Sequence, residues 1–244
     1  NPCQKSVDSN PCQEDLTGAE TTMPRKQSKK RQKALQRKAA KRKQKRAQRR
    51  SRHSGVRTFL RPAAHWPLHE CLLTEEWQEE GAIVQVLVAR RSPLGQIATG
   101  TFLVDPGCLG VKSAFASLFR SQREYEQELR RRITEQQAMV SADLNLVAKI
   151  IREAIAYARQ LGFSPDPDYR DAMIVLGDAD PDACDIPIPL GSKDGKPLYI
   201  AGPYDDIDEI MAKLAKAVGP DGFQYLVPIS GDTEIFVDDE EDWE

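Results

Sequence analysis

AIVQVLVARRSPLGQIATGTFLVD, residues 82–105, decides the fold of this 244-residue chain. Its two halves, 82–90 and 97–105, are rich in β-branched and apolar side chains, which favour strands. A Pro-Leu-Gly sequence at 93–95 lies between them and is typical of a turn. We therefore predict an antiparallel β-hairpin, and we expect the folded body of the chain to be built around it.

The pattern downstream of this hairpin predicts three helices. Over 111–137, apolar side chains recur three, four or seven positions apart, as they do on one face of a helix. A second apolar stripe covers 144–161, with Ser141 as the expected N-cap and Gly162 as the expected stop. A third helix is expected over 205–218.

Further strand signals complete the body. Residues 186–190 and 198–201 are expected to form a hairpin around the Asp-Gly pair at 194–195. Residues 223–228 are expected to form the last strand. The resulting order, β-β-α-α-β-β-α-β, predicts an α+β fold (mixed α/β) of small sheets with about three helices packed on them.

Charge divides the chain into two parts. Between Thr21 and His69 there are 18 Lys or Arg residues and no Asp or Glu, whereas 70–244 holds 16 basic and 33 acidic residues. The formal net charge of −2 therefore hides a +18 stretch joined to a −17 body. Such asymmetry is typical of a tail that binds a polyanion.

Four segments follow from this division. Residues 1–22 are predicted to be a disordered polar segment, and Met23 is an alternative start of the protein. Residues 23–59 form the basic arm, predicted to be disordered because it has too few apolar side chains to offset its ordering entropy. Residues 60–232 are predicted to form the acidic α/β domain, and 233–244 an acidic tail.

The basic arm predicts binding to nucleic acid. Lys and Arg that contact phosphates release condensed counterions, which supplies affinity without reading sequence. No aromatic residue occurs from Asn1 through Thr58, so base stacking and sequence readout are not expected. The expected partner is RNA, in preference to DNA, or a ribonucleoprotein surface, contacted through 23–57. The sixteen residues predicted to bind it are Arg25, Lys26, Lys29, Lys30, Arg31, Lys33, Arg37, Lys38, Lys41, Arg42, Lys43, Lys45, Arg46, Arg49, Arg50 and Arg52.

Other features exclude whole classes of protein. Five scattered cysteines do not indicate a disulfide framework, and no apolar run approaches the roughly 18 residues of a membrane span. The N-terminus lacks the apolar segment of a signal peptide. The sequence thus predicts a cytoplasmic protein with no membrane association and no cofactor.

Two motifs resemble ligand loops. Four closely spaced aspartates, the first three at alternate positions, resemble an EF-hand calcium loop: Asp178, Asp180, Asp182 and Asp185. The sixth loop position is Ala183 instead of Gly and the twelfth is Pro189 instead of Glu, so the pattern favours a solvated loop over a weak cation site. GSKDGKP at 191–197 lacks the spacing and the following helix of a phosphate loop, and is interpreted as a hairpin turn.

The cysteines and histidines give weaker signals. Cys108 lies in a Gly-flanked junction before a predicted helix, where a thiol can be activated, but no histidine follows it in the chain. We interpret it as structural, with a nucleophile as the alternative. His65, His69 and Cys71 are spaced like ligands but lack a clear fourth, so packing roles are favoured over zinc.

Four blocks resemble a family of uncharacterised bacterial proteins: WPLHE at 66–70, GTFLVDPGCLGVK at 100–112, KIIREAIAYARQLGF at 149–163 and GKPLYIAGP at 195–203. The resemblance covers most of 65–203 and leaves the basic arm outside it. It implies a shared domain, and it implies no catalytic residues.

The leading interpretation is a non-enzymatic protein that binds nucleic acid nonspecifically through its arm. One alternative is a metal-dependent hydrolase or nuclease that uses Asp105, Asp178 and Asp180. Another is a protein-interaction domain with a dispensable arm. In the leading interpretation the acidic tail competes with phosphates for the arm, so truncation after Val237 is expected to tighten RNA binding at low salt.

Overall fold

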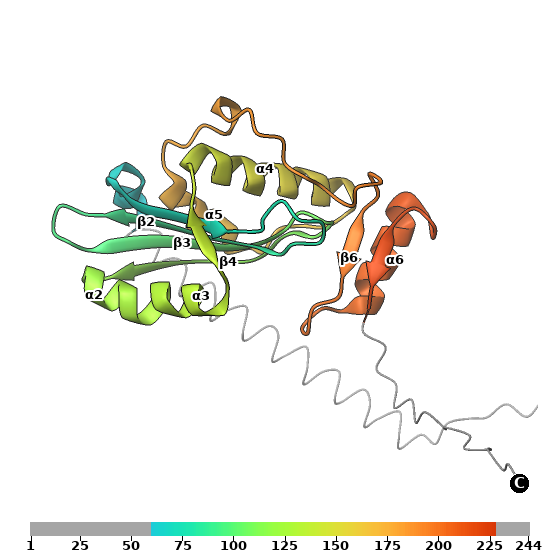
Figure 1. Ribbon diagram of the computed structural model, residues 1–244, viewed down its shortest axis with the longest axis horizontal. Helices are drawn as coiled ribbons and strands as arrows, with labels where there is room; N and C mark the ends of the chain where they lie inside the picture. Colours follow the sequence, from blue (N-terminus) through green and yellow to red (C-terminus); the bar gives the residue numbers. More distant parts are fainter. Residues whose placement is uncertain (1–59, 228–244) are drawn as a thin grey trace, which may run out of the picture. The chain divides into compact units, whose positions relative to one another are not determined.

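The computed structural model describes residues 60–227, drawn in colour in Figure 1. The arm with its sixteen predicted contacts and the acidic tail fall outside the described residues. At the centre is an antiparallel sheet of five strands in the order β4-β3-β2-β1-β5. These strands are β1 (Leu68–Thr74), β2 (Val84–Arg91), β3 (Ile97–Asp105), β4 (Gly110–Phe119) and β5 (Met139–Ser141).

The predicted hairpin is confirmed as β2 and β3. The two strands pair in unbroken antiparallel register from Val84 opposite Val104 to Arg91 opposite Ile97. Gly95 closes the turn with a φ of 83°, a left-handed conformation that favours glycine. The hairpin occupies the interior of the sheet, with β1 beside β2 and β4 beside β3, which accounts for its apolar composition on both faces.

The prediction of one helix over 111–137 is wrong for its first third. Residues 110–119 form β4, which pairs with β3 along its whole length. The apolar spacing that suggested a helix fits a strand equally well: Ala114 is buried in the core under α4, while its neighbour Phe115 is 45% exposed. Only the remainder is helical, as α2 (Gln122–Tyr125), the π-helical turn η2 (Glu126–Arg130) and α3 (Arg131–Gln136).

Helices cover both faces of the sheet (Figure 1). The long helix α4 (Leu144–Gln160) packs on one face, together with α5 (Tyr169–Ala172) and the 3-10 turn η3 (Met173–Leu176). The α2–α3 segment packs on the opposite face. Two short 3-10 turns, η1 (Arg61–His65) and η4 (Pro181–Ala183), complete this part.

The ends of α4 test the predicted caps. Its N-cap is Asp143, whose Oδ1 accepts the amide hydrogens of Asn145 and Leu146 at 2.8 and 3.3 Å. The prediction of Ser141 was wrong because that residue ends β5, two positions too early. Gly162 follows the helix with a φ of 84°, so the predicted stop is confirmed.

A second, smaller sheet is built from the C-terminal elements. It contains β6 (Leu198–Ile200) and β7 (Gln224–Leu226), which pair in parallel and are joined through α6 (Ile207–Val218). The third helix and the last strand were therefore predicted. One buried cluster joins this unit to the β3–β4 turn and to the C-terminal end of α4. Its members include Cys108 of the turn, Leu161 just after α4, Tyr199 of β6, Leu214 of α6 and Phe223 just before β7.

The hairpin expected over 186–190 and 198–201 is wrong. The stretch 186–190 forms no strand, since Pro187 and Pro189 lack the N–H groups that a ladder needs. The turn at 194–195 does exist, closed by a hydrogen bond from Ser192 N to Lys196 O of 2.7 Å. Strand β6 then pairs with β7 and not with the segment before the turn.

The α+β fold class is confirmed by these two sheets and their covering helices. Within residues 60–227, no helix combines the length and the apolar character needed to span a bilayer.

Candidate functional site

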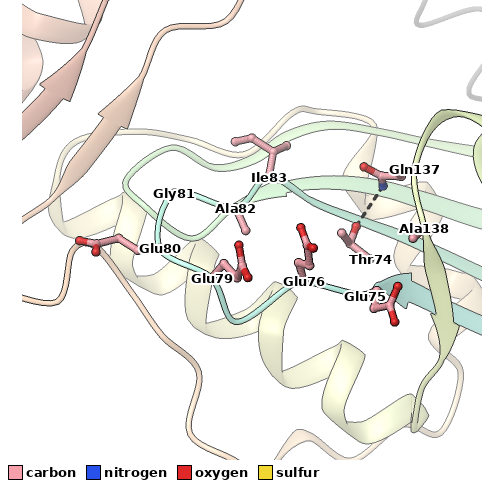
Figure 2. A pocket seen from close by; sticks show the side chains of 10 residues that line it. All are labelled: Thr74, Glu75, Glu76, Glu79, Glu80, Gly81, Ala82, Ile83, Gln137 and Ala138. Carbon is pink, nitrogen blue, oxygen red and sulfur yellow. Dashed lines mark hydrogen bonds between the residues drawn. The ribbon is translucent and has the colours of Figure 1, made fainter.

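An acidic hollow lies beside the loop that joins β1 to β2 (Figure 2). Its volume is about 410 Å³, and the four glutamates of the loop line it: Glu75, Glu76, Glu79 and Glu80. Figure 2 shows the Glu76 and Glu79 carboxylates pointing to the same side of the loop, whereas the Glu80 side chain points away from them. At the opposite side Gln137 donates a hydrogen bond of 3.0 Å from Nε2 to the Thr74 hydroxyl. The hollow therefore presents negative charge around a polar wall, which favours cations.

A second hollow of about 240 Å³ shares residues 79–82 with the first. Its other walls are Trp77, the turn at 106–107 and the loop 189–193. Ser192 lines it and is 6% exposed, yet its hydroxyl has no hydrogen-bond partner among the described residues. Buried hydroxyls are normally paired, so this one is an exception among the described residues.

The loop 189–193 is fixed in place by backbone contacts. Gly191 N donates to Pro106 O at 3.0 Å, and Lys193 N donates to Glu80 Oε1 at 2.9 Å. Gly191 has a φ of 72°, and a Cβ there would lie 2.5 Å from Lys196 O. Only glycine fits such a position. GSKDGKP does form a turn, and residues 191–193 of it border the smaller hollow, but the hairpin expected around that turn is not formed.

The β3–β4 turn places Asp105 and Cys108 in the interior behind this hollow. Asp105 is 3% exposed; its Oδ1 accepts the Cys108 amide hydrogen at 3.1 Å, and its Oδ2 has no partner among the described residues. Burial raises the pKa of the Asp105 carboxyl above its usual value. Burial, and then the neighbouring Asp105, also raise the pKa of the Cys108 thiol. A thiol in these surroundings stays protonated at neutral pH, which fits a structural role.

A buried ion pair ties β4 to the C-terminal unit. Lys112 Nζ lies 2.8 Å from Asp205 Oδ2, and both side chains are largely buried. Asp205 also accepts hydrogen bonds from the Gly202 amide at 2.9 Å and the Tyr199 hydroxyl at 3.4 Å. Burial raises the pKa of Asp205, but these hydrogen bonds and the Lys112 charge outweigh it, and the pKa lies below its usual value. The arrangement is fully paired, as expected of a structural contact.

A second polar cluster lies under the α2–α3 segment. Tyr125 is fully buried and donates a hydrogen bond from its hydroxyl to Glu70, which also pairs with Arg130 Nε at 3.0 Å. Tyr125 and Arg130 are five positions apart, and the π-helical turn between them brings both side chains to the same carboxylate. Burial and the Glu70 contact raise the pKa of Tyr125.

The predicted hydrolase carboxylates are not brought together. Asp178 accepts a hydrogen bond of 3.0 Å from Arg90, which is opposite Ala98 near the start of β3. Asp105 ends that strand seven residues later, which corresponds to roughly 23 Å along the strand. Asp180 caps η4. Within 60–227 no three His, Cys, Asp or Glu side chains are grouped as metal ligands.

The remaining sequence candidates take up separate contacts. Asp182 pairs with Arg152 at 2.8 Å, on the outside of the molecule. His69 contacts the edge of the Tyr125 ring, with 6.1 Å between ring centroids, and Cys71 is buried in the core under α4. Burial raises the pKa of Cys71 to about 12.

Two residues with unusual environments in the described part, Arg90 and Ser192, were not singled out from the sequence. Arg90 is 5% exposed and is the last residue of the strand expected over 82–90; the available signal was a basic residue at the end of a run of apolar ones. Ser192 looks like an ordinary turn residue, and no local pattern distinguishes it. Its position between three loops depends on contacts across more than eighty residues of sequence.

Comparison with known proteins returns no match to a family model, to a curated protein or to a solved structure. The resemblance to uncharacterised bacterial proteins and the cytoplasmic location therefore stay predictions from the sequence.

Proposed function

We propose that the protein binds nucleic acid without sequence specificity, RNA in preference to DNA, through residues 23–57. The observation that carries the proposal is the density of charge: between Arg25 and Arg52, 16 of 28 positions are Lys or Arg and none is acidic. Each side chain placed on a phosphate releases condensed counterions, and this gain needs no particular base sequence.

The composition of the arm supports RNA as the partner. Alanine, glutamine, lysine and arginine dominate it, and all four are good helix formers. Repulsion between like charges opposes a helix until phosphates neutralise them. Basic segments that gain structure on binding are a recurrent mode of RNA recognition. The lack of aromatic side chains through Thr58 removes base stacking, so contacts go to the backbone.

The negative charge of the body, residues 60–244, opposes binding to nucleic acid, so the proposal needs the arm as the source of affinity. Residues 60–227 contain 25 acidic and 17 basic side chains, and residues 228–244 add eight acidic ones. A surface with this balance repels phosphates at low ionic strength. Affinity for a polyanion is therefore assigned to the arm, with the body acting against it.

A charge-matched pair of variants tests the proposal in the full chain. The arm variant changes eight residues to Gln: Lys41, Arg42, Lys43, Lys45, Arg46, Arg49, Arg50 and Arg52. The control variant changes to Gln eight exposed residues of the body: Arg61, Arg120, Arg123, Arg131, Arg132, Arg159, Arg170 and Lys216. Both variants have the same net charge, so they differ only in where the positive charge is lost.

Fluorescence anisotropy with labelled single-stranded RNA and a DNA of equal length provides the measurement. The arm variant is expected to lose at least 100-fold in affinity, and the control less than fivefold, since local charge density sets counterion release. Equal losses in the two variants would show that net charge and not the arm governs binding. A chain of residues 58–244 that binds as tightly as the full chain would reject the proposal outright.

A further inference from the structure

The strand β4 forms one edge of the central sheet (Figure 1). It runs for ten residues, whereas β5 at the opposite edge has only three. In an edge strand, alternate backbone N–H and C=O groups point away from the sheet. Within residues 60–227, the one backbone hydrogen bond to the outer side of β4 runs from Asp166 N to Val111 O at 2.9 Å. The described part of the chain therefore leaves the edge backbone uncovered from Ser113 to Phe119.

This open part of the edge lacks the features that prevent strands of different molecules from pairing. Edge strands are usually protected by charged side chains, proline, a bulge or short length. The register of β4 is irregular only at its start, opposite Leu103 and Val104. SAFASLF at 113–119 has no charged residue and no proline, and it pairs with β3 in regular register. Phe115 and Leu118 within it are 45% and 36% exposed. The edge is therefore suited to pair with a further strand.

The sequence of this edge is self-complementary in an antiparallel pair. Residues 113–117 read Ser-Ala-Phe-Ala-Ser, which is the same in both directions. A two-fold axis at Phe115 thus places each of these residues opposite a residue of the same type in a second copy. Ala114 lies in the core under α4, so Phe115 is on the other face of the sheet, where its side chain is accessible. The two Phe115 rings then form a cross-strand aromatic pair, which stabilises a sheet.

This pairing leaves no charge buried without a partner. Lys112 is the only charged residue of β4, and its Nζ already lies 2.8 Å from Asp205 Oδ2. In the same register Lys112 lies opposite Leu118 of the second copy, at the end of the paired stretch. Like charges are therefore not brought together across the axis, although the body as a whole is acidic.

We propose that the protein forms a homodimer in which the β4 edges of two copies pair in antiparallel register, centred on Phe115. The pairing joins the two central sheets into one continuous sheet. Main-chain hydrogen bonds supply the affinity, and the opposed Phe115 side chains fix the register. The inference does not depend on nucleic-acid binding by the arm.

Sedimentation velocity of the full chain, freed of nucleic acid, tests the dimer at micromolar concentrations. Phe115→Lys and Phe115→Glu each place like charges opposite one another at the axis, and each is expected to raise the dimer Kd at least about 50-fold. An equimolar mixture of the two variants is expected to recover the dimer, because unlike charges then meet. The matched controls Leu94→Lys and Leu94→Glu change an 88% exposed turn residue outside the edge, and they are expected to dimerise like the wild type.

A cysteine at the axis gives a second measurement. Residues directly opposite in an antiparallel pair have Cα atoms about 4.5–5.5 Å apart, within the range of a disulfide. In a chain with Cys3, Cys12 and Cys184 changed to Ser, Phe115→Cys is expected to form a covalent dimer on mild oxidation, and Leu94→Cys is not.

Three results would overturn the proposal. A full chain that is monomeric throughout would leave the edge to the residues just before Leu60, which belongs to a buried cluster that contacts Ala116 of β4. Phe115 variants that dimerise like the wild type would place the interface elsewhere. A dimeric wild type whose Lys and Glu variants stay monomeric when mixed, with no disulfide from Phe115→Cys, would exclude the axis at Phe115.

Discussion

Arg90 is expected to be among the most important residues for the stability of the sheet. Its guanidinium is 5% exposed and donates to three backbone carbonyls: Val175 O at 2.6 Å, Trp66 O at 2.8 Å and Leu176 O at 2.9 Å. These bonds join β2 to η3 and to the segment after η1. Arg90→Met keeps most of the apolar stem but removes every donor.

The expected loss of stability follows from the backbone carbonyls that lose their hydrogen-bond donor. Val175 and Leu176 are buried, so each of their carbonyls loses a charged donor that water cannot easily replace. At about 1.5–2 kcal/mol for each carbonyl, the free energy of unfolding falls by about 3–4 kcal/mol. For a chain of this size that corresponds to a decrease in Tm of about 6–16 °C.

Urea unfolding monitored by circular dichroism at 222 nm measures this loss. Asp178→Asn is the control, because Asp178 also contacts Arg90 but its side chain is 90% exposed and the carbonyl bonds remain. The control is expected to unfold close to the wild-type midpoint. A loss below about 1 kcal/mol for Arg90→Met, or an equal loss in the control, would refute the reasoning.

Three further predictions concern other parts of the chain. The triple variant Cys3→Ser, Cys12→Ser, Cys184→Ser leaves Cys71 and Cys108 as its two thiols, and both are buried with a raised pKa. These two thiols are expected to react with a disulfide reagent at pH 8 only in denaturant. Rapid reaction of the native protein would contradict this expectation. Lys112→Met is expected to cost about 2–4 kcal/mol at pH 7, because Asp205 is left buried without its cation. The pKa of the Asp205 carboxyl is depressed in the folded state, so its contribution to stability exists above pH about 4 and is lost as the pH falls further. Urea titrations at pH 7 and pH 3 should show that the stability difference between Lys112→Met and the wild type shrinks at the lower pH. A constant difference would count against the ion pair. Truncation after Val237 is expected to tighten RNA binding severalfold at low salt and to have little effect at high salt, with unchanged binding at low salt as the contrary result in a filter-binding assay.

The sequence was most informative where one local signal agreed with the tertiary contacts. The β2–β3 hairpin and the C-terminal end of α4 were predicted because apolar composition, turn residues and a glycine stop all pointed to one structure. The strand β4 was missed because an apolar spacing of three and four positions also divides into two strand faces, and only pairing with β3 decides between them.

The candidate site lay beyond sequence reasoning for a different reason. The smaller hollow is formed by three loops that meet only in the folded chain: the β1–β2 loop, the β3–β4 turn and the loop at 189–193. A lone serine in a turn carries no sign that its hydroxyl will be buried and unpaired. The basic arm is the opposite case, because charge density is a property of composition and can be read directly.

The salt dependence of RNA binding is the most direct test of the central claim that the arm supplies the affinity. If about 6–10 phosphates of a single-stranded RNA are contacted, log K against log salt for the full chain has a slope of about −4 to −7. The arm variant with eight substitutions is predicted to reduce this slope by about half or more, and the control with eight substitutions on the body is predicted to leave it unchanged. Equal slopes for the wild-type chain and the arm variant would contradict the account.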